Sequence, residues 1–301
     1  MAIAMARNKQ EQAADSRLGK VLHALRADPG LALGLVMVLL VIVCTVFAPL
    51  LTPYGYNDQN IRNRLKPGFW SAEGTPEHPL GTDGIGRDLW SRLVYSYRSS
   101  LAIGVSAVVL SLLIGLTVGL ISGTMGGWVE ALLMRLTEVQ MALPFIVLAL
   151  TVLSMSTPTV PLIVVVLSLS SWPTTARLVR SATITERQSD YVTAARAMGA
   201  STPRIIVQYV ARNILTGLLI TSIINLGTMM VLEATLSFIG IGVQPPVPSF
   251  GNIVADGKVY ITQAWWVTTF PGIAVLFAVL GLNLVGDSLH KYLDPRMRTQ
   301  V

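Results

Sequence analysis

ERQSDYVTAARAMGASTPRIIVQYVARN, residues 186–213, is a polar stretch with four arginines between two long apolar runs. The flanking runs, at about 160–180 and 214–241, are each long enough to cross a bilayer, which needs about 20 helical residues. A chain that keeps a polar stretch between two such runs exposes it at a membrane surface. The stretch therefore predicts a membrane-spanning fold and a surface that holds a partner.

The composition is typical of a membrane protein. Of the 301 residues, 52% are hydrophobic and only 13% are charged, and the mean hydropathy is +0.60. A soluble domain of this length needs more charged surface. The net charge of +6 does not indicate nucleic-acid binding, because the lysines and arginines flank apolar runs and are not interleaved with aromatic residues. Cys44 is the single cysteine, which excludes a disulfide framework.

Six apolar runs are long enough to span a membrane as helices. They cover about 30–51, 99–123, 131–154, 160–180, 214–241 and 267–288. The first run is longer than the apolar part of a signal peptide, and no small-residue cleavage site follows it, so we expect it to remain as a span. The sequence thus predicts an all-α integral membrane protein with six transmembrane helices.

Basic residues are concentrated in the connections on one side of this topology. Five lysines and arginines precede the first run, six lie between Arg177 and Arg212, and three lie in the tail after the sixth run. The opposite connections are nearly neutral, except that residues 52–98 carry six basic and five acidic side chains. By the positive-inside rule, we expect both termini and residues 186–213 to face the cytoplasm.

Capping signals divide residues 186–213 into two short helices. Ser189 is suited to cap a helix over 190–198, and Gly199 is suited to end it, because glycine readily adopts the left-handed conformation. Ser201 and Pro203 favour the start of a second helix. Helical spacing places five residues of the first helix on one face: Tyr191, Val192, Ala194, Ala195 and Met198. From spacing alone, this helix either lies on lipid headgroups or docks into another protein.

The first helix and its continuation carry a family resemblance. DYVTAARAMGAS, residues 190–201, looks like the EAA loop of ABC importer permeases, with matching residues at Asp190, Ala194, Ala195 and Gly199. In that family the loop forms the coupling helix that fits a cleft on the cytoplasmic ATPase subunit. The resemblance implies these coupling residues here: Asp190, Tyr191, Ala194, Ala195, Arg196, Gly199 and Ser201. The family pattern ends in Leu-Pro, but Arg212 stands where the proline is expected.

Three further stretches narrow the resemblance to the C-type subunit of dipeptide and oligopeptide importers. GTDGIGRD at 81–88 resembles the segment before the second span of those subunits. LSFIGIG at 236–242, followed by a Gln-Pro-Pro run, looks like the end of their fifth span. GDSL at 286–289, with Leu-Asp-Pro at 293–295, is similar to their carboxyl terminus. The resemblance implies the type I ABC importer permease fold.

The resemblance also implies a location and partners. It places the chain in a bacterial cytoplasmic membrane beside a B-type permease subunit, two cytoplasmic ATPase subunits, a periplasmic or lipid-anchored solute-binding protein, and membrane lipid. The implied substrates are di- or oligopeptides, with nickel chelates, glutathione or oligosaccharides as alternatives. No cofactor and no enzyme activity are expected in this chain, because it has neither a G-x-x-x-x-G-K-[ST] loop nor a cluster with metal-ligand spacing. ATP and Mg²⁺ would bind to the ATPases.

The same topology divides the chain into four parts. These are a cytoplasmic segment at 1–29, the first span with a periplasmic loop at 30–98, a five-helix core with the coupling loop 186–213 at 99–290, and a cytoplasmic tail at 291–301. The resemblance implies that the long outer loop lies where the binding protein docks. Residues 86–97 could instead form an amphipathic cover on the outer leaflet.

Polar residues inside the runs are candidates for the translocation path. Glu233 lies near the outer end of the fifth run, where we expect it to meet water or cap a neighbouring span rather than contact substrate. Asn225 and Asn283 are better placed for the interior, where each either bonds a neighbouring helix or contacts substrate. An ATP-independent secondary transporter or channel is the alternative of a different class, and it would need paired broken spans and an intramembrane acid.

Overall fold

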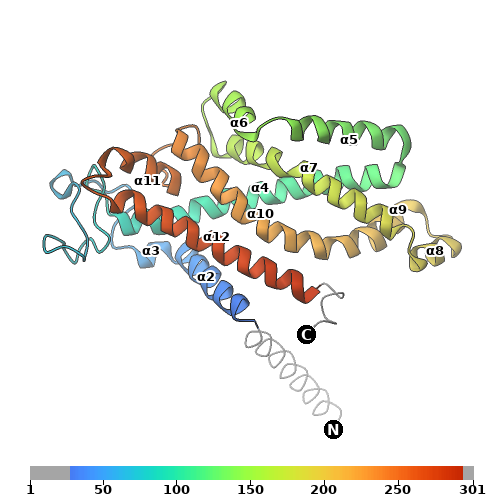
Figure 1. Ribbon diagram of the computed structural model, residues 1–301, viewed down its shortest axis with the longest axis horizontal. Helices are drawn as coiled ribbons and strands as arrows, with labels where there is room; N and C mark the ends of the chain where they lie inside the picture. The colour runs from blue at the N-terminus through green and yellow to red at the C-terminus, as the bar shows by residue number, and fades with distance from the viewer. Residues whose placement is uncertain (1–27, 294–301) are drawn as a thin grey trace, which may run out of the picture.

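The computed structural model describes residues 28–293 and is almost entirely helical (Figure 1). In this range, the one β contact is an isolated bridge between Thr82 and Asp88. In the same range, five helices or helical runs are long and apolar enough to cross a membrane: α2 (Pro29–Val46), α4 (Leu89–Met125), α7 (Val160–Glu186), the run Thr202–Ile239 and α12 (Trp266–Leu293). The predicted all-α membrane class is confirmed. The basic residues before position 28 and most of the predicted tail lie outside the described residues.

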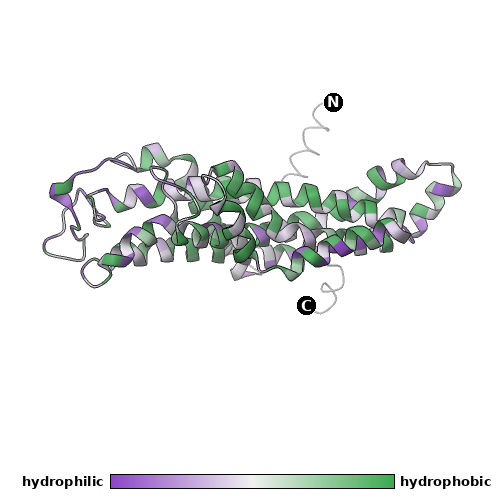
Figure 2. Ribbon diagram, turned by 90° about the horizontal axis from the view of Figure 1, so that it is seen from above, coloured by the Kyte–Doolittle hydropathy of each residue, from purple (hydrophilic) through white to green (hydrophobic). Residues whose placement is uncertain are grey.

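Shorter elements complete the chain. The run Thr202–Ile239 consists of α9 (Thr202–Arg204), the π-helical segment η2 (Ile205–Val210) and α10 (Ala211–Ile239). The remaining short helices are α3 (Ala48–Leu51), η1 (Ile61–Asn63), α8 (Asp190–Ala197), α11 (Phe250–Gly257) and η3 (Lys258–Tyr260). Figure 2 shows hydrophobic residues along the length of the bundle and hydrophilic residues gathered toward its two ends, as expected for helices that cross an apolar layer.

The third predicted span is not one straight helix. Residues 131–154 fall in α5 (Gly127–Ala142) and α6 (Phe145–Ser154), which meet at an angle of 86°. The break is at Leu143, whose backbone is extended, and Pro144 follows it. Proline disfavours the helical conformation in the residue before it. The described residues therefore give six crossings only if this bent pair forms one of them.

The helices continue past the predicted spans. α4 begins at Leu89, well before the expected start at residue 99, and α7 ends at Glu186 instead of residue 180. Hydropathy detects the part of a helix inside hydrocarbon, whereas the helix itself continues into the polar layers. Residues 89–97 form the first turns of α4 and are mostly buried in the protein. The alternative of an amphipathic cover on the outer leaflet is therefore wrong.

The contact between α4 and α7 depends on glycine. Three glycines at four-residue spacing on α4 lie against three residues of α7: Gly115 against Thr175, Gly119 against Val179, and Gly123 against Thr183. A Cβ atom added at Gly119 would lie 2.5 Å from the Cβ of Val179 and 2.7 Å from the carbonyl oxygen of Ala176. Small residues allow this close approach between membrane helices. We call this contact the glycine seam.

The end of the bundle opposite α8 is covered by residues 52–88 and α11, which together we call the loop cap (Figure 1). Asp83 accepts hydrogen bonds from Arg87 and Arg92, each at 2.6 Å, and both arginines also contact Asp256 of α11 at 3.0 and 3.3 Å. Burial opposes ionisation of Asp83, but the guanidinium groups of Arg92 and Arg87 hold its pKa below the ordinary value of 3.8. Within the loop cap, these ion pairs join residues 52–88 to α11, and Arg92 joins both parts to α4.

Candidate functional site

Residues 186–213, which we call the polar segment, lie at the far end of the bundle from the loop cap (Figure 1). The segment joins the end of α7 to the start of α10 and contains α8, α9 and η2. The two short helices predicted from capping signals are present, although the second one continues directly into α10. α8 begins at Asp190, whose negative charge suits the positive end of a helix dipole.

The predicted single face of α8 is divided between the protein interior and the surface. Val192 and Ala195 are 0% and 2% exposed and pack with residues of α7, η2 and α10: Val179, Ile205, Val210, Ile214 and Leu218. Tyr191, Ala194 and Met198 are exposed instead, and they follow one another at helical spacing on the surface. α8 is therefore anchored by Val192 and Ala195, and it presents a second stripe, formed by Tyr191, Ala194 and Met198, at the surface.

The end of α8 has the predicted glycine stop. Gly199 has a φ of +84°, its N–H donates to the carbonyl oxygen of Arg196, and the N–H of Ala200 donates to that of Ala195. This pair of bonds is a Schellman motif. Ser189 and Ser201 occupy the expected cap positions, but neither side chain makes a capping hydrogen bond, and the Ser189 hydroxyl donates to Glu186 instead.

A polar contact ties α8 to the helices on either side of it. The Tyr191 hydroxyl bonds the carboxylate of Glu186 at the end of α7, and Asn213 of α10 donates to the Tyr191 oxygen at 2.8 Å. Partial burial and the bond to Glu186 raise the pKa of Tyr191 above its ordinary value of 10.0. The sequence reasoning missed Glu186 and Asn213, because no local pattern shows that they converge on Tyr191.

A third missed residue, Arg187, joins the polar segment to the glycine seam. Arg187 donates to the carbonyl oxygens of Gly123 and Thr124 at 2.9 and 2.7 Å. These carbonyls belong to the last turn of α4, where unpaired carbonyl groups and the negative end of the helix dipole favour a cation. In the sequence, the only indication of this contact was the position of a basic residue directly after α7.

Three exposed arginines of the polar segment have no ion-pair partner within residues 28–293: Arg196, Arg204 and Arg212. Ser201 is exposed beside them. Without a proline at Arg212, the helical run is not interrupted here, and the chain passes from α9 through the π-helical η2 into α10. A π-helical turn often marks a functional position in a helix.

The candidate path residues do not form one cluster. Asn225 and Asn283 are half-buried, and the side-chain oxygen of Asn283 lies beside Gly227 of α10. Glu233 is fully buried and accepts hydrogen bonds from Ser100 of α4 and from Ser237, both at 2.7 Å. It therefore bonds the neighbouring span and does not meet water, because α11 packs against the adjoining part of α10. Eight residues of helix separate it from Asn225, about 12 Å along the axis.

The described residues thus form an all-α, multi-pass membrane protein with an anchored helix, α8, that projects beyond its spans. Residues 115–299 match the family model "Binding-protein-dependent transport system inner membrane component", and residues 16–67 match "N-terminal TM domain of oligopeptide transport permease C". The chain belongs to this family of ABC importer permeases, and it is a transport subunit rather than an enzyme. The resemblance seen in its motifs is confirmed.

Curated relatives agree with this assignment. The chain is 39% identical over 265 residues to the di/tripeptide transport system permease protein DppC of Pseudomonas aeruginosa, covering 88% of each chain. It is 38% identical over 276 residues to the dipeptide transport system permease protein DppC of Escherichia coli, covering 92% of each. It is also 34% identical to the dipeptide transport system permease protein DppC of Haemophilus influenzae over 91% of this chain and 92% of that protein.

A solved structure matches the fold. The similar chain comes from an inward-facing conformation of the MetNI methionine ABC transporter, with a TM-score of 0.56 and 20% sequence identity. The match covers 67% of this chain and 96% of that one. The predicted type I ABC importer permease fold is thus confirmed, and the likeness at this identity concerns the fold alone.

Proposed function

We propose that this chain is the C-type permease subunit of an importer that carries di- or oligopeptides across the cytoplasmic membrane by alternating access. Support for the peptide substrate comes from the relatives whose names specify dipeptide or di/tripeptide transport. Nickel chelates, glutathione and oligosaccharides are the alternatives within the same class.

The polar segment is the proposed docking surface for a cytoplasmic ATPase subunit. The observation that carries this proposal is the division of α8: Val192 and Ala195 hold it against α7 and α10, while Tyr191, Ala194 and Met198 face outward. A partner that presses on the outward face moves α8 as a body with the ends of two spans. Asp190, Arg196, Gly199 and Ser201 complete the proposed coupling surface.

The proposed orientation of the chain in the membrane indicates where its other partners would bind. With the polar segment and both termini in the cytoplasm, the loop cap faces the periplasm, where a soluble or lipid-anchored solute-binding protein would deliver substrate. A B-type permease subunit would complete the pathway as a heterodimer, and the two ATPase subunits would bind ATP and Mg²⁺. Asn225, Asn283 and Glu233 stay candidates for the path between these two ends.

Substitution of Ala194 by glutamate tests the docking surface. Burying an unpaired carboxylate at an interface costs several kcal/mol, so Ala194→Glu should lower co-purification of the ATPase subunits at least about tenfold with an unchanged amount of permease in the membrane. Thr185→Glu, an exposed change on the last turn of α7, is the matched control. Equal ATPase recovery from both variants would contradict the proposed docking surface.

Uptake by the reconstituted complex tests the transport class and the substrate. Labelled dipeptide uptake should require ATP inside proteoliposomes, and unlabelled di- and oligopeptides should compete with it. Uptake that persists without ATP would support a secondary transporter or channel instead. Competition by a nickel chelate, glutathione or an oligosaccharide, with none by peptides, would reassign the substrate and leave the ATP-driven class intact.

A further inference from the structure

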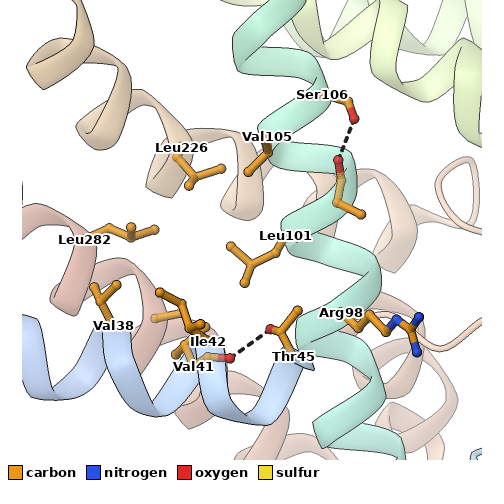
Figure 3. Close-up of a pocket in the computed structure, with 12 residues that line it drawn as sticks. Val38, Val41, Ile42, Thr45, Arg98, Leu101, Val105, Ser106, Leu226 and Leu282 are labelled. Carbon is orange, nitrogen blue, oxygen red and sulfur yellow. Dashed lines mark hydrogen bonds between the residues drawn. The ribbon is translucent and has the colours of Figure 1, made fainter. Parts of the chain in front are cut away.

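A groove of about 560 Å³ lies between α2, α4, α10 and α12 (Figure 3). Its walls are mainly apolar side chains at helical spacing, including Val38 and Ile42 on α2 and Leu101 and Val105 on α4. The four helices belong to runs that are long and apolar enough to cross the membrane. The groove is therefore a hollow in the part of the protein that lies within the bilayer.

The polar groups in the walls are satisfied by their own helices. The Thr45 hydroxyl donates to the carbonyl oxygen of Val41 at 2.8 Å, and the Ser106 hydroxyl donates to that of Ala102 at 2.7 Å (Figure 3). Neither hydroxyl needs a donor or acceptor from an occupant. Most of the groove thus offers only apolar contact, which suits a hydrocarbon chain.

Arg98, at one end of the groove, is the lining residue whose polar group is not satisfied by its own helix. It is exposed, and no hydrogen bond or ion pair joins its guanidinium to any residue in the described range 28–293. Figure 3 shows its side chain leaving α4 near Thr45 and pointing away from the apolar side chains. Thr45 is the next-to-last residue of α2, so this end of the groove lies where hydrocarbon gives way to headgroups. Long basic side chains reach toward that layer.

We propose that the groove binds a phospholipid, with an acyl chain along the walls of α2 and α4 and the phosphate on Arg98. The guanidinium group pairs favourably with phosphate oxygens, and the volume falls within the range of about 300–1,000 Å³ seen for small-molecule sites. A helix of another protein would fill the apolar part equally well, but it would pair with Arg98 only if it placed an acidic residue at the edge of the hydrocarbon layer, where a phospholipid has its phosphate. The inference depends on membrane insertion and not on the proposed substrate.

A photoreactive residue in the groove tests this site. With p-benzoylphenylalanine in place of Ala102, the complex is reconstituted in vesicles of phosphatidylethanolamine and phosphatidylglycerol, irradiated, and measured by intact-protein mass spectrometry. The expected product carries the mass of one phospholipid. Arg98→Gln should lower its yield about fivefold, because a basic residue near a lipid surface contributes about 1 kcal/mol, and Arg98→Lys should retain most of it.

The control places the same photoreactive residue at Leu39, which is 60% exposed on α2 and does not line the groove. Its lipid adducts come from bulk lipid and should not respond to Arg98→Gln. If the adduct at position 102 is equally insensitive, the groove holds no specific phospholipid and the proposal fails. An adduct with the mass of another protein subunit would also overturn it and would assign the groove to a protein helix.

Discussion

The glycine seam and the polar segment both depend on glycine, but for opposite reasons. At Gly119 the backbone φ is ordinary but there is no room for a side chain, since an added Cβ atom would lie 2.5 Å from the side chain of Val179. At Gly199 there is room, with nothing within 4 Å of an added Cβ, but the φ of +84° disfavours any other residue. The first glycine allows two helices to touch, and the second only ends a surface helix. The seam should therefore behave as a rigid unit and the polar segment as a locally adjustable one.

The largest effect should come from filling the seam. Gly119→Leu overpacks a contact whose nearest atoms include the carbonyl oxygen of Ala176, which a rotamer change cannot move. We expect destabilisation of more than about 3 kcal/mol and loss of the monodisperse complex in fluorescence-detected size-exclusion chromatography. Gly217→Leu on α10 is the control, because nothing lies within 4 Å of a Cβ added there. A similar loss in both variants would show that the seam is not specially packed.

A large effect is also expected in the loop cap, where buried charged side chains pair with one another. Asp83→Asn leaves Arg87 and Arg92 short of negative charge, and both side chains are at most 10% exposed. Breaking a buried ion pair costs about 3 kcal/mol or more. Hydrogen exchange within residues 52–88 should rise strongly, whereas Asp58→Asn, a change at an exposed acid of the same loop, should alter it little.

The same network predicts the response of the loop cap to acid. Because folding lowers the pKa of Asp83 below 3.8, its contribution to stability is fully present above that value. It is lost only as the pH falls through the lowered pKa. Protection of residues 52–88 should stay constant from neutral pH down to about 4 and then decrease. A decrease that begins between pH 7 and 5 would point to another group.

A smaller and local effect is expected at the end of α8. Gly199→Ala places a side chain in the left-handed region, at a cost of about 1–2 kcal/mol. Hydrogen exchange should increase in residues 190–204, with the unfolding midpoint of the whole complex unchanged. Gly217→Ala, in an open helical position, should slightly slow exchange. If Gly199→Ala lowers the global midpoint as strongly as Gly119→Leu does, the distinction between rigid and adjustable regions is wrong.

The smallest effect is expected at Tyr191. Tyr191→Phe removes the bonds to Glu186 and Asn213, and because Tyr191 is 38% exposed, exchange in α8 should rise only about twofold. Folding raises the pKa of the phenol, so its contribution is present below pH 10.0 and is lost as the pH rises through the raised pKa. The wild-type protein, but not Tyr191→Phe, should therefore loosen at α8 in strong alkali. An identical alkaline response would contradict this link.

Three prolines show how much of the fold could be predicted from the sequence. Pro144 interrupts the third predicted span, whereas Pro173 and Pro271 lie inside α7 and α12 without ending either helix. All three lie in apolar runs, and membrane helices tolerate proline when neighbouring groups compensate for the lost hydrogen bond. Whether a run breaks or continues depends on those neighbours, which hydropathy does not contain.

The candidate site shows the same limit. Gly199 and the cap positions of α8 were predictable, because capping depends on a few consecutive residues. The burial of Val192 and Ala195 and the exposure of Tyr191, Ala194 and Met198 were not predicted, because both stripes fit one broad helical face. The contacts of Tyr191 with Glu186 and Asn213 join three elements and leave no local pattern.

The sequence by itself determined the helical membrane class, the approximate spans and the family motifs. These are local properties, since hydropathy, capping and motif spacing are each read over a short window of chain. Only the tertiary structure decided that α5 and α6 meet at 86°, that Gly119 lies against Val179, and that Arg98 stands without a partner among residues 28–293 at the end of an apolar groove. Each of these depends on atoms far apart in the chain that become neighbours only when the helices pack.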